Sequence, residues 1–346
     1  MASTIKDVAK MADVSISTVS RVINDSKPVS PEARRRVLHA IGVLDYKPNE
    51  VARSLVTKKS NIIGVIVSDV GNQYVSQVLR GVEEIGRMYN YDILLSSSYG
   101  DPEVELKFAN LFSQKQVEGI IIISEILNQK LLYKLDEFKI PCVVINRFYN
   151  IDEAPTVTTN NKAASFNMTD YLINLGHTSI GYVAMRKDMD RTNEKYKIRG
   201  YRDAMRAAGL KPSILYCEGL TEKDAMDVFE EHEEDLLGGK YSVLFCSQDL
   251  MAIHLMNVMR DKGVKIPEDI SFAGFGGTAL SEIYRPKLTT VKEPYYDIGA
   301  VAIRKLFKIL DEKNPDRDDE MILLPVEIIK RQSVKDLTNQ KELLED

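Results

Sequence analysis

A chain of 346 residues, 44% of them hydrophobic and 28% charged, has the composition of a folded protein and is long enough for two or three domains. It contains no run of about 18 apolar residues and begins without the apolar stretch of a signal peptide, which excludes a transmembrane helix and favours the cytoplasm. Residues 1–60 hold 11 of the 46 Lys and Arg but only 6 of the 51 Asp and Glu, which leaves 35 and 45 for the remainder. A basic head on an acidic body indicates a polyanionic partner, although so small a surplus also arises by chance.

Two short helices joined by a tight turn are predicted near the N-terminus. Ser3 or Thr4 caps the first helix, and Ser15 caps the second. The inward-facing apolar positions recur at three-and-four spacing: Ile5, Val8, Ala9, Ala12, Val19, Val22 and Ile23. This pattern predicts a helix-turn-helix.

A third helix is predicted from residue 31. Ser30 caps it, and Pro31 suits its first position. Its apolar stripe is expected to be Val37, Leu38, Ile41 and Leu44. The three helices together predict an all-α head.

The second helix consists largely of poor helix formers, so packing rather than propensity must hold it. Its outward face is expected to carry Ile16, Ser17, Thr18, Ser20 and Arg21. Small hydroxyl residues and free N–H groups at a helix start suit phosphates, and an arginine can read a guanine edge with two hydrogen bonds. We interpret this face as a DNA reader; the alternative is a small helical bundle with a solvated arginine.

Residues 49–60 predict a short capped helix or linker. Asn49 can cap it, and Leu55 lies among the cations Arg53, Lys58 and Lys59. An exposed leucine among cations suits a wedge inserted into a DNA minor groove. Alternatively, this segment is an interdomain linker that packs Leu55 on the body.

The body, from residue 61, alternates strand-like runs with helical patterns. The runs cover 62–67, 91–97, 118–123, 141–146, 180–185, 242–247 and 270–275. Helical patterns include 74–90, 193–208, 222–236 and 295–313. Such alternation predicts two α/β lobes with parallel sheets and a ligand position at the carboxyl ends of the strands.

No catalytic or metal constellation is evident in the sequence, so we expect neither an enzyme nor a cofactor. The histidines are scattered, and Cys142, Cys217 and Cys246 are too far apart for metal spacing and favour reduced structural thiols. The stretch "GFGGTA" resembles a phosphate loop only weakly and is better explained by a tight turn.

The stretches "TIKDVAKMADVSISTVSRVIN" and "LDYKPNEVARSLVTKKSNIIGVIVSD" closely resemble the LacI/GalR family of bacterial repressors, and the likeness continues in "KQVEGIIII", "LGHTSIGYV" and "IPEDISFAGF". It implies a helix-turn-helix head (1–48), a hinge (49–60), a periplasmic-binding-protein-like core (61–334) and a tail (335–346). The core would have an N-lobe of 61–161 and 291–323 and a C-lobe of 162–290 and 324–334. It also implies a homodimer on a palindromic operator.

The resemblance places Ile16, Ser17 and Arg21 at base-reading positions and Leu55 at the operator centre. The other DNA-contacting residues that it implies are Thr4, Ser15, Thr18, Asn24, Asn49 and Arg53. Asp13 stands where many members have glycine in the turn. Because aspartate tolerates left-handed backbone, we expect the turn to form.

The effector position departs from that of sugar-binding relatives. Lys197 and Gly276 stand where those relatives have a hydroxyl-gripping arginine and an aspartate. Lysine cannot replace a planar bidentate arginine, which argues against a sugar effector of the usual kind. The neighbouring residues that can still hold a small anion or sugar phosphate are Tyr74, Arg147, Asn160 and Asp249, although lobe packing explains Asn160 and Asp249 better.

The stretches "EPYYDIGAVAIRKLFKIL" and "LRGVEEIGRMYNYDILLSSS" resemble the catabolite-control branch of the family, whose members bind the serine-phosphorylated phosphocarrier protein HPr as co-repressor. The co-regulator surface implied comprises Arg80, Glu84, Met88, Tyr296, Asp297, Val301, Arg304 and Lys308. Cations beside apolar residues suit a phosphoserine-bearing helix, whereas the alternative is that Ala300, Val301 and Leu306 are only core residues. Ile16 and Ser17 replace the Met and Ala usual in that branch, which predicts a different operator preference.

These observations predict a dimeric transcription regulator of carbon-metabolism genes that represses and also activates. Partner binding would change the angle between the lobes and order the hinge on DNA. The alternatives are a repressor with the same head that responds to a sugar, sugar phosphate or nucleotide, and a plain solute-binding protein, which the basic head opposes.

Overall fold

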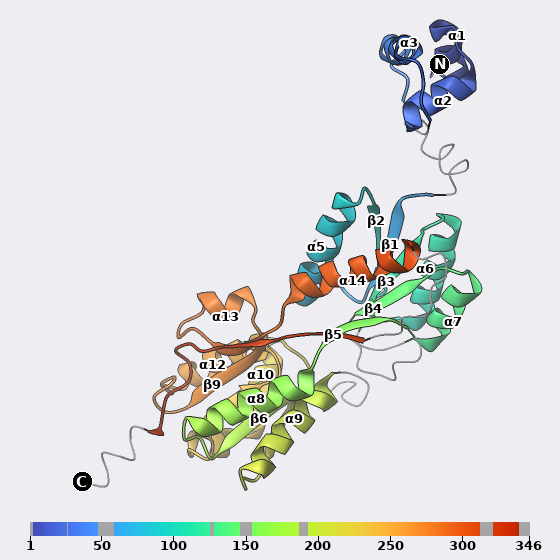
Figure 1. The fold of residues 1–346 in the computed structure, drawn as a ribbon. Coiled ribbons are helices and arrows are strands. Elements are labelled where there is room, and N and C mark those ends of the chain that lie inside the picture. Colours follow the sequence, from blue (N-terminus) through green and yellow to red (C-terminus); the bar gives the residue numbers. More distant parts are fainter. Residues whose placement is uncertain are drawn as a thin grey trace. The chain divides into compact units, whose positions relative to one another are not determined.

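The computed structural model describes residues 3–25, 27–47, 59–124, 128–145, 154–186, 193–311 and 321–338. The chain divides into two compact units, Met1–Ser60 and Asn61–Asp346 (Figure 1). None of the helices in these ranges has the length and apolar character needed to cross a bilayer.

The head contains three helices that begin at the predicted caps: α1 (Ile5–Ala12), α2 (Ile16–Asn24) and α3 (Pro31–Val43). Thr4 and Asp7 form a reciprocal capping box, in which the hydrogen bonds from Thr4 lower the pKa of Asp7. Asp13 adopts left-handed backbone with φ 48° and ends α1. The turn between the first two helices therefore forms without glycine.

The core of the head is small and apolar. Its buried side chains are Val8, Ala9, Ala12, Val19, Val22, Val37 and Ala40. The expectation that Leu38 faces inward is wrong, because this side chain is 54% exposed. Val37, Ala40 and Ile41 follow the three-and-four spacing of one face, and Leu38 lies about 100° around the helix from Val37. The Ser3 hydroxyl donates to the carbonyl of Leu44 over 2.8 Å and ties the two ends of the bundle together.

Two six-stranded sheets form the second unit. The first has the order β11-β5-β4-β3-β1-β2, and all of its neighbours are parallel. Its strands are β1 (Ile62–Val67), β2 (Asp92–Ser97), β3 (Gly119–Ile123), β4 (Cys142–Ile145), β5 (Thr156–Thr159) and β11 (Met321–Leu324). We call the lobe built on this sheet the N-lobe.

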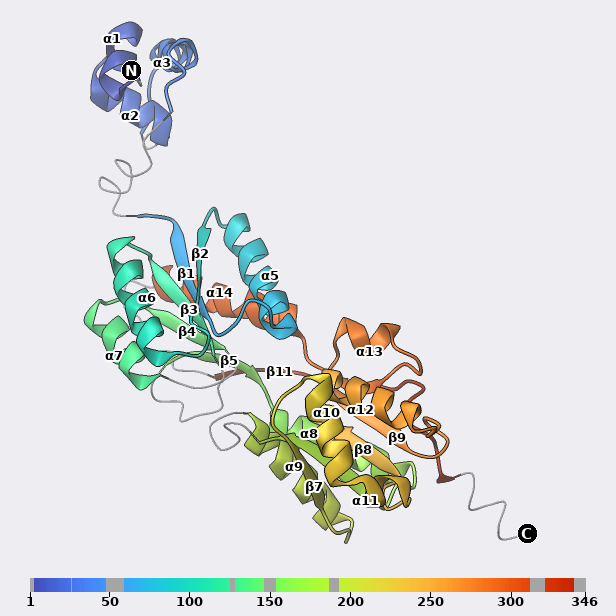
Figure 2. The same ribbon diagram turned by 180° about the vertical axis from the view of Figure 1, so that it is seen from behind.

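The N-lobe sheet has helices on both faces. Helices α5 (Gln73–Met88) and α14 (Tyr295–Asp311) lie side by side on one face, and α6 (Pro102–Gln114) and α7 (Gln129–Glu137) cover the other (Figures 1 and 2). Alternate residues of β3 serve the two layers, since Ile121 packs with α5 and α14 whereas Ile120 packs with α6 and α7. Both faces are therefore buried, as a parallel sheet requires.

The second sheet, which defines the C-lobe, has the order β12-β10-β9-β8-β6-β7, with only β12 antiparallel to its neighbour. Its strands are β6 (Ile180–Met185), β7 (Ser213–Cys217), β8 (Val243–Cys246), β9 (Ser271–Gly276), β10 (Thr289–Lys292) and β12 (Glu327–Ile329). Its helices are α8 (Asn161–Asn174), α9 (Glu194–Ala207), α10 (Glu222–Glu231), α11 (Glu233–Leu237), α12 (Asp249–Asp261) and α13 (Ala279–Ile283).

The chain crosses between the sheets after β5, after β10 and after β11. Strand β10 continues to Lys292, two residues past the expected boundary at 290, and β11 continues to Leu324. The single helix expected over 222–236 is wrong, because His232 leaves helical geometry and separates α10 from α11.

The three cysteines all lie in described ranges, and none is in a disulfide. Cys217 and Cys246 are buried in the C-lobe core, and Cys142 is half-buried in the N-lobe. Burial raises the pKa of Cys142 and of Cys217 to about 12, so both stay protonated and unreactive.

Candidate DNA-reading helix and regulatory sites

The outward face of α2 carries hydroxyl and cationic side chains at its start. Ile16 is 45% exposed, and Ser17 and Arg21 are exposed as well. The Ser15 hydroxyl oxygen accepts a hydrogen bond from the N–H of Thr18 and lies 2.7 Å from the Ser17 Oγ and 2.9 Å from the Thr18 Oγ1. Three hydroxyl groups are thus gathered at the helix N-terminus, where unpaired N–H groups attract phosphate.

Arg21 differs from two of the three arginines of α3. Arg34 pairs with Asp25 over 2.7 Å, and Arg36 approaches Asp13 at 3.9 Å. By contrast, the Arg21 guanidinium makes no ion pair within residues 3–25 and 27–47 of the head. It is therefore available to a ligand outside the head.

The remaining residues predicted to contact DNA differ in their exposure. Thr4 is exposed, and its hydroxyl donates to the Asp7 carboxylate over 2.7 Å. Asn24 is half-buried, its side-chain N–H donates to the Ser20 hydroxyl over 3.2 Å, and its side-chain oxygen is buried. Asn49, Arg53 and Leu55 lie outside the described residues.

Helices α5 and α14 approach each other at backbone distance because each carries a glycine at the crossing. A Cβ added at Gly81 would lie 2.1 Å from the Tyr296 carbonyl oxygen, and one at Gly299 would lie 2.0 Å from the Val78 carbonyl oxygen. No other residue fits at either point. This close contact brings the predicted co-regulator residues of both helices onto one surface.

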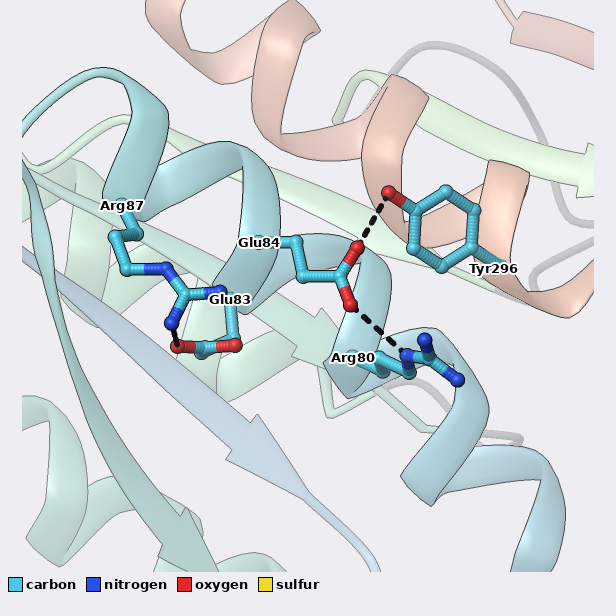
Figure 3. Close-up of polar contacts among 5 residues, drawn as sticks. All are labelled: Arg80, Glu83, Glu84, Arg87 and Tyr296. Atoms are coloured by element: carbon cyan, nitrogen blue, oxygen red, sulfur yellow. Dashed lines mark hydrogen bonds and ion pairs between the residues drawn. The ribbon is translucent and has the colours of Figure 1, made fainter.

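A carboxylate joins the two helices on that surface. The Arg80 Nε donates to one oxygen of Glu84 over 2.9 Å, and the Tyr296 hydroxyl donates to the other over 2.9 Å (Figure 3). These two hydrogen bonds, Arg80 first, hold the pKa of Glu84 below its usual value, and the bond to Glu84 raises the pKa of Tyr296. Glu84 therefore stays ionised while Tyr296 stays protonated.

The other predicted co-regulator residues lie at or near the surface. Met88 is 73% exposed, Asp297, Arg304 and Lys308 are exposed, and Val301 is half-buried. The core alternative holds for Ala300 and Leu306, which are buried against α5 and the sheet. Arg304 makes no ion pair with another residue of the described ranges, so this surface offers an unengaged cation beside apolar side chains.

Asp249, one of the predicted effector residues, begins α12 at the carboxyl edge of the C-lobe sheet and is 1% exposed. Its carboxylate accepts hydrogen bonds from the Thr278 N–H at 2.7 Å, the Thr278 hydroxyl at 3.0 Å and the Thr290 hydroxyl at 2.5 Å. Burial raises the pKa of Asp249, and the hydrogen bonds from Thr290 and Thr278 oppose the rise. The group holds the loop after β9 and is not directed toward a ligand.

Lys197 and Asn160 are also engaged within the protein. The Lys197 Nζ donates to the Ser247 carbonyl over 3.0 Å and lies 3.9 Å from the centroid of the Phe275 ring. The side-chain oxygen of Asn160 accepts from the Ala163 N–H and caps α8. Arg147 lies outside the described residues. Asn160 and Asp249 therefore have the structural roles that the sequence favoured for them over ligand binding.

The stretch "GFGGTA" comprises the end of β9 and the tight turn that follows it. Gly277 has φ 69° and its N–H donates to the Thr290 hydroxyl, and the Thr278 N–H donates to Asp249. Because these amides point into the protein, they are not available to a phosphate.

Three residues near this turn were not singled out from the sequence: Thr159, Glu293 and Tyr295. The Thr159 hydroxyl donates to one oxygen of Glu293 over 2.7 Å, and the Tyr295 hydroxyl donates to the other over 3.2 Å. They lie where β5 and β10 lead into the other lobe, and only the fold brings Thr159 and Glu293 together. In the sequence, the pair of adjacent tyrosines at 295 and 296 was the only pattern that could have drawn attention to these residues.

Comparison with known proteins decides the family. The sequence profile of "Bacterial regulatory proteins, lacI family" matches residues 4–49, and that of "Periplasmic binding protein-like domain" matches residues 169–334. Catabolite control protein A of Priestia megaterium is 36% identical over 335 residues, which cover 96% of this chain and 99% of that protein. The chain belongs to the LacI family. The HTH-type transcriptional regulator RegA of Clostridium saccharobutylicum is similar to the same extent, with 35% identity over 96% of this chain and 99% of that protein.

A solved structure agrees with the LacI-family fold. The lac repressor dimer bound to operator and an anti-inducer superposes with a TM-score of 0.84 at 23% identity, covering 97% of this chain and 100% of that chain. The predicted fold class, a helix-turn-helix head with a two-lobed α/β core, is confirmed. The protein is a LacI-family DNA-binding transcriptional regulator similar to catabolite control protein A and RegA, and these relatives are regulators and not enzymes.

Proposed function

We propose that this regulator controls carbon-metabolism genes as a homodimer on a two-fold operator, as repressor and at some promoters as activator. Serine-phosphorylated HPr, docked on the surface formed by α5 and α14, is the signal that raises its affinity for DNA. The likeness to catabolite control protein A over nearly the whole chain supports this assignment.

The observation that carries the co-regulator proposal is the composition of the α5–α14 surface. Met88 and Val301 supply apolar contact area, and Arg304 supplies an unengaged guanidinium among the described residues. A phosphoserine carries nearly two negative charges and strong acceptor oxygens, which arginine binds with charge-assisted hydrogen bonds. A helix with phosphoserine beside apolar residues fits such a surface.

Arg80 has a second role in this proposal. In the free protein its Nε is bound to the Glu84 carboxylate (Figure 3). The Glu84 carboxylate already neutralises the Arg80 guanidinium, so an uncharged serine hydroxyl gains nothing by competing for Arg80. A phosphoserine dianion can compete, and the surface thereby discriminates the phosphorylated partner from the unphosphorylated one.

Calorimetric titration of the full chain with HPr in both forms tests the proposal. Replacing Arg304→Met removes a charge-assisted contact of about 1.5–3 kcal/mol, so affinity for phosphorylated HPr should fall about tenfold or more. Arg87→Met is the control, because Arg87 is an exposed arginine on the neighbouring helix α5 and pairs with Glu83 away from Tyr296 (Figure 3). No difference in affinity between phosphorylated and unphosphorylated HPr would refute the proposal.

In the head, we propose that Arg21 reads a base edge and that Ile16 and Ser17 set the operator preference. Arg21→Ala should weaken binding to the operator by about 1–3 kcal/mol and relax selectivity at one base pair. A competition assay against random duplexes measures this, with Arg35→Ala on α3 as control. An equal loss on random DNA would show that Arg21 contacts only phosphates.

A further inference from the structure

Gly276, which by the sequence resemblance stands where sugar-binding relatives carry an aspartate, leaves little room for a side chain beside Tyr295. A Cβ built on it would lie 3.0 Å from the Tyr295 hydroxyl oxygen and 3.6 Å from a carboxylate oxygen of Asp249. Its φ of 130° is also a conformation that side chains rarely adopt. The Tyr295 hydroxyl thus lies directly beside the space in which a side chain at position 276 would begin, and a Cβ there would make the tyrosine shift.

Tyr295 reaches this space from the start of α14 and contacts the N-lobe as well. Its ring meets the Tyr74 ring edge-on, with centroids 4.9 Å apart, at the beginning of α5. Its hydroxyl donates to Glu293, whose other oxygen accepts from Thr159 at the end of β5. One side chain therefore joins the loop after β9 in the C-lobe to two elements of the N-lobe.

Two polar groups of the C-lobe beside Phe275 and Gly276, Asp249 and Lys197, are engaged within the protein. Asp249 accepts three hydrogen bonds from Thr278 and Thr290, and Lys197 is bound to the Ser247 carbonyl. Burial, with the carboxylates of Glu293 and Asp249, raises the pKa of Tyr295 well above its usual value, so its hydroxyl remains a donor. A sugar entering here would have to break these bonds and displace a phenol ring.

We infer that Tyr295 is the residue that determines ligand specificity at this position between the lobes. It acts as a covalently attached occupant that joins the two lobes and excludes sugars. The glycine at position 276 accompanies it because any Cβ there would crowd the tyrosine hydroxyl and strain the backbone. This inference does not rest on the identity of the protein partner at the α5–α14 surface.

Chemical rescue of the full chain tests the inference. Tyr295→Gly should lower the melting temperature and leave a space shaped for a phenol, which p-cresol should fill and so raise the melting temperature by several degrees. Tyr296→Gly is the matched control, since it deletes the neighbouring tyrosine from the same helix turn, where the hydroxyl bonds Glu84 on the surface. No rescue of Tyr295→Gly, or equal rescue of both variants, would overturn the inference.

A second comparison serves if Tyr295→Gly does not fold. Gly276→Ala should lower the melting temperature more in the native background than in Tyr295→Phe, because the phenylalanine lacks the oxygen that the new methyl group meets. The backbone strain at Gly276 is the same in both backgrounds and cancels. Equal losses would overturn the inference, as would a sugar that raises the melting temperature of the native chain but not of Lys197→Met.

Discussion

Two adjacent tyrosines of α14 make the same kind of hydrogen bond in opposite settings. The Tyr296 hydroxyl donates to Glu84 on the outward α5–α14 surface, and the Tyr295 hydroxyl donates to Glu293 between the lobes. Around Tyr296 the charges are exposed and Arg304 is unengaged among the described residues, whereas around Tyr295 the neighbouring polar groups bind one another. A site ready for a partner keeps unsatisfied binding capacity, and a site that has become part of the fold does not.

This difference suggests how one LacI-family core can exchange one input for another. The two tyrosines are consecutive, so a protein docked on Tyr296 bears on the helix turn that also carries Tyr295. A regulator whose interlobe position is filled by its own side chain can then respond to a surface partner through α14. The coupling is a difference in binding free energy between lobe arrangements.

The largest expected effect is a loss of stability when the packing of α14 against α5 is disrupted. Gly299→Val would place a side chain on the Val78 carbonyl and force α14 away from α5, at a cost of about 3 kcal/mol or more. Urea unfolding measures the loss. Gly86→Ala on α5 is the control, because the atoms nearest to its Cβ would be the flexible ends of Ile93 and Ile303, and the Tyr91 carbonyl oxygen lies at an ordinary contact distance of 3.6 Å. Similar losses from both variants would contradict backbone-level packing at Gly299.

A second test compares the two polar networks by deleting a carboxylate from each. Asp249→Ala leaves the Thr278 N–H without its acceptor in a buried site and removes the bond from the Thr290 hydroxyl, which should cost about 3 kcal/mol. Glu84→Ala removes a surface pair and should hardly change the urea midpoint. Equal destabilisation would mean that the outward network is as structural as the inward one.

The negative charge of Glu84 on the docking surface should have a smaller effect, on the affinity for HPr. Glu84→Gln keeps an acceptor for Arg80 but removes one negative charge from the docking surface. Affinity for phosphorylated HPr should then rise severalfold, because the phosphate no longer meets a carboxylate. Affinity for unphosphorylated HPr, which brings no charge to this surface, should change little, so the preference for the phosphorylated form should grow. Calorimetry with both forms of HPr checks this, with Glu83→Gln as control. An unchanged ratio of the two affinities would mean that the phosphate does not bind beside Glu84.

The smallest effect is a pair of opposite pH slopes. The pKa of Glu84 is lowered, so the stability that it contributes is present above its usual value of 4.5 and is lost as pH falls through the lowered pKa. The pKa of Asp249 is raised, so its contribution is present below its usual value of 3.8 and is lost as pH rises through the raised pKa. Between about pH 3 and 6, the stability of the native chain relative to Glu84→Gln should rise with pH, and relative to Asp249→Asn it should fall. Denaturant unfolding across this range decides it, and parallel slopes would contradict the two assignments.

Local chemistry made the head predictable from the sequence. Thr4, Ser15 and Ser30 each act on an N–H group within three residues, so their caps depend little on the remainder of the fold. The inward position of Leu38 was mispredicted because an apolar residue beside the stripe has the same local pattern as one within it. Its 54% exposure follows from how the three helices pack.

The core was predictable in outline, but its threonine-rich strands were not. The apolar runs of β1, β3, β4, β6, β8 and β9 mark buried parallel strands, whereas β5 and β10 are rich in threonine and lack such a run. The contact between Tyr295 and Gly276 spans 19 positions of sequence and two lobes. Sequence comparison could flag Gly276 as a departure, but only the fold shows which side chain has taken its space.

Operator binding by the full chain tests the central claim most directly, namely that the input site is the α5–α14 surface and not the position between the lobes. An operator fragment selected from random duplexes is titrated with serine-phosphorylated HPr, unphosphorylated HPr, ribose, glucose or glucose 6-phosphate present. Operator affinity should rise about tenfold or more with the phosphorylated protein alone. A sugar or sugar phosphate that changes the affinity while phosphorylated HPr leaves it unaltered would contradict the account.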